Sequence, residues 1–102
     1  MTKKPTVNAA AATLDEILSE LPVSQKEVAE ATGIPTAHLS MLKAGNRRFT
    51  PEYDLRLSRY FRQSEGFWLR LQMRADIRKA KAEKPGITKE VKAIDQRKLV
   101  SA

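Results

Sequence analysis

The spacing of apolar residues predicts short amphipathic helices separated by polar segments that contain glycine or proline. The first helix is expected to begin at Ala9, where an alanine run favours helix, or at Thr13, which forms a possible capping box with Glu16. It ends before Pro22. Its apolar face is core scaffolding and consists of Leu14, Ile17, Leu18 and Leu21.

Residues 23–48 predict two short helices joined by a tight turn. Ser24 and Glu27 have the spacing of a capping box, which begins the first of these helices. Gly33 lies at the turn, where a residue without a Cβ bends at least cost, and Gly45 ends the second helix. The side chains expected to face the core are Val28, Ala29, Thr32, Leu39 and Leu42. This arrangement is a helix-turn-helix.

Two more helices are predicted after the helix-turn-helix. Thr50 caps a helix that has Pro51 at its first position and runs to about Phe61. Ser64 is the expected cap of a last long helix. A short helix from about Thr88 is favoured by the spacing of Ile87, Val91 and Ile94.

The expected fold class is therefore all-α: a lambda-repressor-like five-helix helix-turn-helix domain with a C-terminal helical extension. The 102 residues suffice for a compact helical core. We expect a flexible N-terminal arm at residues 1–8, a DNA-binding domain at residues 9–80 and a basic C-terminal extension at residues 81–102.

Several classes of chemistry are excluded by composition. The chain has no cysteine and one histidine, which excludes disulfides, cysteine-based metal sites and a histidine cluster. It has no paired nucleophile and base and no phosphate-binding glycine-rich loop, so we expect no enzyme activity, no cofactor and no metal. An apolar run of about eighteen residues and a signal peptide are also absent, which predicts a soluble cytoplasmic protein without membrane contact.

Net charge indicates an anionic partner, most simply nucleic acid. The chain carries +7, of which residues 1–69 contribute +1 and residues 70–102 contribute +6. The excess therefore lies beyond the helix-turn-helix. A moderately basic local face is nevertheless formed by Lys43, Arg47, Arg48, Arg56, Arg59 and Arg62.

The order of features in residues 23–48 resembles the Xre/Cro-type helix-turn-helix of lambda-repressor-like proteins. The residues that carry the resemblance are Gln25, Ala29, Gly33, Leu39 and Leu42. In that family the second helix lies in the DNA major groove. The resemblance implies that base edges are read by Thr36, Ala37, His38, Ser40 and Met41.

Phosphate contacts are expected at the start of the motif and in the basic loop that follows it, from Gln25, Lys43, Asn46, Arg47 and Arg48. Thr36 and His38 can hydrogen-bond base edges, and Ala37 and Met41 can contact thymine methyl groups. None of these four is Gln, Asn or Arg, so bidentate contacts are not evident. Water-mediated or shape readout then gains importance.

Residues 50–77 are similar to HigA/VapI-type antitoxins, in which the helix-turn-helix is followed by characteristic short sequences. Here these are Pro51-Glu52, Leu55-Arg56-Leu57, Phe67-Trp68-Leu69, Leu71-Gln72 and Asp76. The resemblance implies a homodimer that binds double-stranded DNA at a palindromic operator and represses its own operon. It also implies that the protein neutralises a HigB-type ribonuclease toxin, which cleaves mRNA on the ribosome.

Two stretches depart from that family. Its usual His-Pro-Gly-Glu sequence ahead of the first helix is replaced by residues 12–16, of sequence Ala-Thr-Leu-Asp-Glu. The glycine that usually ends the fourth helix is replaced by Arg62, which would adopt a left-handed conformation at a small cost or end the helix differently.

Dimerisation is expected through the aromatic-rich segment, because three successive apolar residues cannot all face one side of a helix. A second copy of the chain is the natural cover, since helix-turn-helix proteins that read two half-sites are usually two-fold symmetric. The predicted interface residues are Trp68, Leu69 and Met73.

Two alternatives stay open. One is a stand-alone phage-type or host transcription regulator without a toxin. The other is a helical protein-interaction module in which the helix-turn-helix is scaffold and the basic tail and an exposed Trp68 region form the active surface. That module would bind DNA weakly and without sequence preference.

Overall fold

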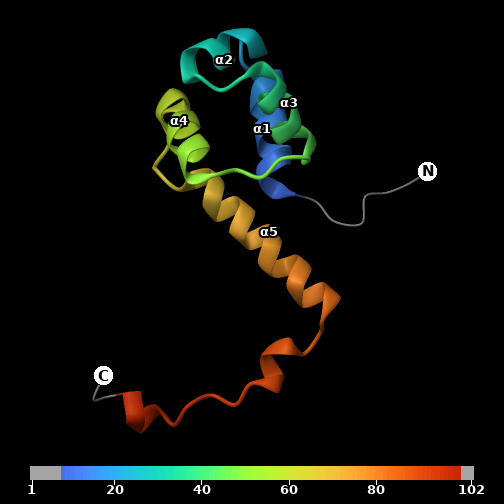
Figure 1. The fold of residues 1–102 in the computed structure, drawn as a ribbon, viewed down its shortest axis with the longest axis vertical. Coiled ribbons are helices and arrows are strands. Elements are labelled where there is room, and N and C mark those ends of the chain that lie inside the picture. Colours follow the sequence, from blue (N-terminus) through green and yellow to red (C-terminus); the bar gives the residue numbers. More distant parts are fainter. Residues whose placement is uncertain (1–7, 100–102) are drawn as a thin grey trace, which may run out of the picture.

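Five α-helices follow one another in the part of the chain that the structure describes, residues 8–99 (Figure 1). In this computed structural model they are α1 (Ala9–Glu20), α2 (Gln25–Thr32), α3 (Thr36–Ala44), α4 (Pro51–Phe61) and α5 (Phe67–Glu83), followed by the 3₁₀ turns η1 (Ile87–Glu90) and η2 (Gln96–Leu99). The expected all-α, five-helix helix-turn-helix fold is confirmed. Residues 1–7 of the predicted arm lie outside the described residues.

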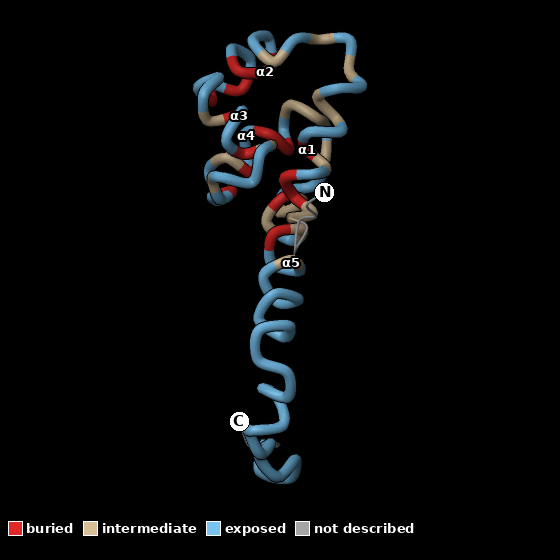
Figure 2. The backbone as a smooth tube through the Cα atoms, turned by 90° about the vertical axis from the view of Figure 1, so that its right-hand side faces the viewer, coloured by how far each residue is buried: buried red, intermediate tan, exposed pale blue. Residues whose placement is uncertain are grey.

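The hydrophobic core lies where α1, α2, α3 and α4 meet one another and the first turns of α5. Figure 2 shows the buried residues gathered in this helical domain, while the rest of α5 and the segment after it are exposed. Phe49 and Trp68 stack with ring centroids 5.4 Å apart. Full burial of a large apolar side chain contributes about 1.5–3 kcal/mol. The large apolar side chains that are fully buried are Trp68, Leu14, Ile34, Leu39, Leu42, Leu57 and Val28.

The helices begin where side chains satisfy their first backbone N–H groups. Asn8 Oδ1 accepts hydrogen bonds from the N–H groups of Ala10 and Ala11, both at 3.1 Å, so α1 starts at the earlier of its two expected positions. Ser24 and Glu27 form the predicted capping box at the start of α2.

The start of α5 differs from the prediction. Ser64 does not cap this helix; the cap position is Gly66, in the left-handed region with φ +90°. The first N–H groups of α5 are satisfied from α4 instead, by the buried carboxylate of Asp54. It accepts hydrogen bonds from Gly66 N at 2.7 Å, Trp68 N at 2.8 Å and Leu69 N at 3.0 Å.

Arg62 ends α4 in the left-handed conformation, with φ 60° and ψ 46°. This is one of the two outcomes that the sequence left open. Within residues 8–99 it is the only non-glycine residue with positive φ. For an L-residue with a Cβ this conformation costs roughly 1 kcal/mol. The chain therefore keeps an arginine where a glycine would be more stable.

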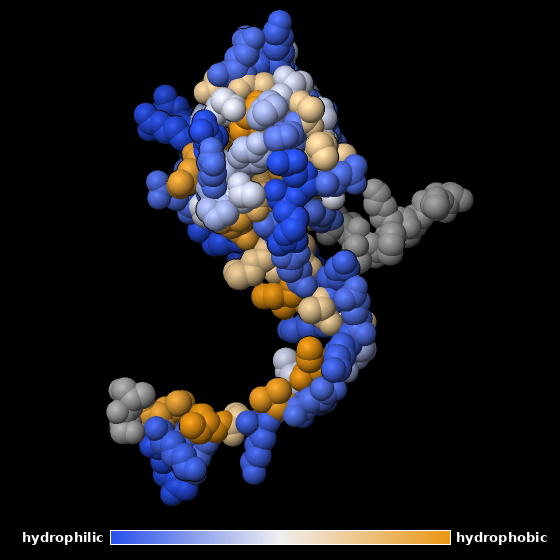
Figure 3. All heavy atoms as spheres, in the orientation of Figure 1, coloured by the Kyte–Doolittle hydropathy of each residue, from blue (hydrophilic) through white to orange (hydrophobic). Residues whose placement is uncertain are grey.

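The segment after α5 does not contain the helix expected from about Thr88. It contains the single 3₁₀ turns η1 and η2, because residues 84–99 are exposed and pack against no core that would stabilise a short helix. Figure 3 shows its apolar side chains on the surface. They are Ile87, Val91, Ile94 and Leu99. Helix α5 itself continues to Glu83, past the expected domain boundary at residue 80. Within residues 8–99, no helix has the length and apolar character needed to span a bilayer.

Candidate nucleic-acid interface

Helices α2 and α3 form the helix-turn-helix, and the side chain of Gln25 joins their exposed ends. Its Nε2 donates to Ser40 Oγ at 2.7 Å and lies 3.3 Å from the carbonyl oxygen of Thr36. The structure thus brings one predicted phosphate ligand together with two predicted base readers. Both amide hydrogens of Gln25 are engaged in this arrangement, so a phosphate contact requires the exchange of one of these bonds.

The outward face of α3 carries most of the predicted base readers. Leu39 and Leu42 are fully buried, which fixes the opposite face of α3 against the core. The side chains left at the surface are Thr36, Ala37, Ser40 and Met41. The first two turns of α3 are therefore accessible to the edges of base pairs in a major groove.

His38, the remaining predicted base reader, is half-buried and turned toward α4. Its Nδ1 lies 2.5 Å from the hydroxyl of Tyr53, at hydrogen-bonding distance. Any hydrogen bond from His38 to a base must therefore use its other ring nitrogen, Nε2. The guanidinium of Arg47 lies 6.0 Å from the centre of the Tyr53 ring, within cation–π range. Tyr53 thus connects the recognition helix with the basic loop, a role that no pattern in the sequence indicates.

The loop between α3 and α4 is held by two side chains one turn apart on α5. The buried amide of Gln72 accepts a hydrogen bond from Phe49 N at 2.7 Å and donates to Phe49 O at 2.9 Å. Asp76 accepts two hydrogen bonds from Arg48, at 3.2 and 2.6 Å. The hydrogen bond from Arg48 lowers the pKa of the Asp76 carboxyl. The positive charge of Lys79 lowers this pKa further, whereas partial burial raises it. The same hydrogen bond raises the pKa of Arg48.

Three of the predicted phosphate ligands surround one hollow of about 600 Å³ between α1, the end of α3 and α5. These are Lys43, Arg47 and Arg48, and Lys79 adds a fourth cation from α5. Small residues line much of the remaining wall: Ala11, Ala12, Ala44, Gly45 and Ala75. Asn46 is exposed in the same loop and is not part of the wall.

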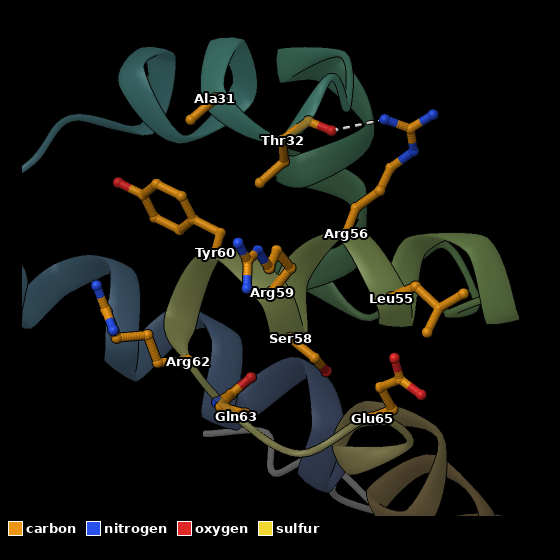
Figure 4. A pocket seen from close by; sticks show the side chains of 10 residues that line it. All are labelled: Ala31, Thr32, Leu55, Arg56, Ser58, Arg59, Tyr60, Arg62, Gln63 and Glu65. Atoms are coloured by element: carbon orange, nitrogen blue, oxygen red, sulfur yellow. Dashed lines mark hydrogen bonds between the residues drawn. The ribbon is translucent and has the colours of Figure 1, made fainter.

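The basic residues of α4 lie elsewhere. Arg56, Arg59 and Arg62 line a second hollow, between α2 and α4, which shares no residue with the first (Figure 4). The sequence suggested one basic face for all six cations, but the structure divides them into two groups of three. Only the first group includes residues of the loop that follows the recognition helix.

Solved structures resemble this chain over most of its length, although no protein-family model and no curated protein matches the sequence. An addiction module antidote protein of the HigA family from Coxiella burnetii is 27% identical, covers 89% of this chain and 100% of its own, and has a TM-score of 0.72. PA4674 from Pseudomonas aeruginosa, solved in complex with its operator DNA, is 24% identical, with coverages of 90% and 98% and a TM-score of 0.74. The Pseudomonas aeruginosa antitoxin HigA, solved with the higBA promoter, is 23% identical, with coverages of 88% and 96% and a TM-score of 0.67.

The chain has the fold of the HigA-type antitoxins. The resemblance identified from the sequence is therefore confirmed. Two residues that carried it, Gln72 and Asp76, hold the loop between α3 and α4 in place. Their spacing of four residues could have indicated a shared helix face, but their partners lie 23 and 28 positions away in sequence.

Within this HigA-type fold, one predicted interface residue is wrong. Trp68 is fully buried in the core, so it cannot contact a second chain, and no exposed Trp68 region exists. Its backbone N–H is held by Asp54 at the start of α5, and its ring stacks on that of Phe49 in the core. Leu69 is half-buried, whereas Met73 is 54% exposed. Ile77, one further turn along α5, is 47% exposed.

Across residues 8–99, acidic and histidine side chains do not gather in groups of three or more that could hold a metal ion. The Asp54 carboxylate is fully engaged in capping α5 and in a contact with Ser58 at 3.4 Å.

Proposed function

We propose that this protein is a sequence-specific DNA-binding repressor that binds a palindromic operator as a homodimer and represses its own operon. The observation that carries the proposal is the exposed start of α3, fixed to Gln25 of α2 and followed by a cationic loop. In this arrangement α3 supplies base contacts, while the loop supplies phosphate contacts that set its register on the duplex.

Phosphate contact is assigned first to Lys43 and Arg47, because Asp76 already holds two donors of Arg48. Arg48 retains further donors for a phosphate, since a guanidinium carries five N–H groups. Asn46, exposed in the same loop, is placed to add a neutral contact. Base specificity is assigned to Thr36, Ala37, Ser40 and Met41, with His38 contributing only through Nε2.

Dimerisation is assigned to the apolar line on α5 formed by the half-buried Leu69 and the exposed Met73 and Ile77. These residues are spaced by four and therefore share one helix face. A two-fold symmetric pair would present two copies of α3 to half-sites about one helical turn apart. The cytoplasmic location predicted from the sequence belongs to this proposal, since a repressor acts where its operator lies.

The antitoxin part of the proposal is that the chain also neutralises a HigB-type ribonuclease toxin. It is supported by the 27% identity to the Coxiella burnetii antidote protein over 89% of this chain. A stand-alone regulator would have no toxin reading frame beside its gene and would leave the activity of a purified HigB-type toxin unchanged.

The test of DNA binding compares the duplex upstream of the protein's own gene with random duplex at about 150 mM salt. We expect a preference of about 10³-fold or more for the upstream DNA and a two-fold symmetric footprint. A ratio near one would contradict the repressor proposal and favour the protein-interaction module.

A further inference from the structure

A second cationic surface lies outside the predicted DNA contacts. It is the hollow of about 780 Å³ between the end of α2 and the outer side of α4, called here the α2–α4 hollow. Figure 4 shows Arg56, Arg59 and Arg62 around it, with Tyr60 at one side and Leu55 at the other. The hollow contains none of the residues to which DNA reading has been assigned.

One arginine forms a fixed wall of the hollow. Arg56 Nη1 donates to the carbonyl oxygen of Thr32 at 2.8 Å, and its Nε donates to Glu52 at 3.0 Å. The guanidinium is thereby held between the end of α2 and the first turn of α4. Its position is set by the protein itself, so the shape of the hollow does not depend on a ligand.

The other two arginines are available for a ligand. Within residues 8–99, the side chains of Arg59 and Arg62 make no hydrogen bond or ion pair. Each guanidinium can bind a carboxylate with two parallel N–H groups. Arg62 also keeps its strained left-handed backbone at the edge of the hollow. Strain of this kind is found preferentially at binding sites.

A buried acceptor in the wall distinguishes between anionic ligands. Gln63 Oε1 is buried and has no hydrogen-bond donor among the described residues. A nucleic-acid phosphodiester or a free carboxylate offers only acceptors and cannot satisfy this oxygen. A polypeptide offers backbone N–H groups together with its acidic side chains. Leu55, which is half exposed beside the arginines, adds an apolar contact that nucleic-acid phosphates would not use.

We propose that the α2–α4 hollow binds an acidic segment of a partner protein. Arg59 and Arg62 pair with carboxylates of the segment, and Leu55 contacts an apolar side chain. Gln63 turns its amide toward the hollow and accepts one of the segment's backbone N–H groups. The proposal does not depend on operator binding, because the two surfaces share no residue.

The test uses the full-length chain and a short fluorescent peptide of alternating glutamate and leucine, with a glutamine–leucine peptide as the neutral control. Binding is followed by fluorescence anisotropy, and the site is mapped from the backbone amide signals in NMR spectra. We expect the acidic peptide to shift the signals of Ala31, Tyr60 and Gln63 and to leave those of Thr36 and Ser40 unchanged. The neutral peptide should shift neither group.

Charge-matched variants separate a built site from general attraction. Arg59→Gln/Arg62→Gln should weaken peptide binding by about tenfold or more, because two charge-assisted contacts are lost. Arg74→Gln/Arg78→Gln, which removes the same charge from the exposed part of α5, should change it less than about twofold in physiological salt. Arg62→Gly keeps the left-handed backbone conformation without strain and should also weaken peptide binding. Because this variant is expected to fold, its weaker binding would exclude misfolding as the cause.

Three results would overturn the proposal. Equal losses in the two double variants would show general electrostatic attraction. Absence of shifts in the hollow at about 1 mM peptide would exclude even a weak site. Shifts of the same hollow signals by random duplex DNA would identify a phosphate-binding surface instead.

Discussion

The two cationic hollows carry three arginine or lysine side chains each from α3, α4 and their loops, yet their surroundings differ. Lys43, Arg47 and Arg48 follow the recognition helix, and Arg48 is held by Asp76 of α5. Arg59 and Arg62 lie on the other side of α4, beside an exposed leucine and a buried acceptor without a donor. Charge alone does not distinguish these surfaces. Their position relative to α3 and the neutral groups beside the cations do.

The largest effect is expected from a substitution at Asp54, which joins α4 to α5 and so supports both surfaces. In the native protein the buried carboxylate of Asp54 accepts from three backbone N–H groups. Asp54→Asn places an amide NH₂ against these donors, so we expect the free energy of unfolding to fall by about 2–4 kcal/mol. Denaturant unfolding measures the loss. Asp76→Asn is the control, since its half-exposed side chain should cost less than about 1 kcal/mol. Equal losses would show that Asp54 does not hold α4 and α5 together.

Charge-matched pairs separate the two surfaces on DNA. Lys43→Gln/Arg47→Gln should lower operator affinity by about 10- to 100-fold and reduce the slope of log K against log salt by about 2, because two phosphate contacts are lost. Arg59→Gln/Arg62→Gln removes the same charge and should change affinity less than about threefold. Titrations of each double variant with operator DNA at several salt concentrations measure both the affinity and the salt slope. A larger loss in the second pair would reverse the assignment of the two hollows.

Base readers should change preference rather than general affinity. Thr36→Ala and His38→Ala should each alter the preferred base at one position per half-site by about 1 kcal/mol. Arg47→Ala should instead weaken binding to all sequences alike. Competition with operators mutated one base pair at a time measures both effects. If all three variants lost affinity equally on operator and random DNA, the proposed base readers would be wrong.

The strain at the α2–α4 hollow predicts a stabilising substitution. Arg62→Gly should raise the free energy of unfolding by about 0.5–1 kcal/mol, because glycine adopts the observed φ of 60° without a Cβ clash. Arg59→Gly, inside the last turn of α4, should lower it by about 1 kcal/mol. Thermal unfolding compares the two. A lower free energy of unfolding for Arg62→Gly would show that the Arg62 side chain stabilises the fold and is not kept for ligand binding.

The smallest expected effect is a pH dependence of the loop clamp. The pKa of Asp76 is lowered in the folded protein, so its stabilising contribution is fully present above the ordinary carboxyl pKa of about 3.9 and is lost as pH falls through the lowered value. It should amount to less than about 1 kcal/mol, since both partners are about half exposed or more. Asp76→Asn should remove this acid-dependent part from the unfolding curve. An unchanged pH profile in the variant would exclude the ion pair as its source.

The local features of the fold could be predicted from the sequence because they depend on neighbours. The capping box of Ser24 and Glu27 rests on contacts within a few residues. Long-range pairs could not be predicted in this way. Asp54 caps a helix that begins about a dozen residues later, and Tyr53 of α4 contacts His38 of α3. Trp68 was misplaced for the same reason, since helical spacing shows that a residue has an apolar side but not what covers it.

One measurement tests the division into two surfaces most directly. Backbone amide signals of the full-length chain are followed during titration with the duplex upstream of its own gene. We expect the largest shifts at Thr36, Ser40 and Arg47, and none at Tyr60 and Gln63. The opposite pattern, with the α2–α4 hollow responding and the start of α3 unchanged, would contradict the assignment of DNA reading to α3.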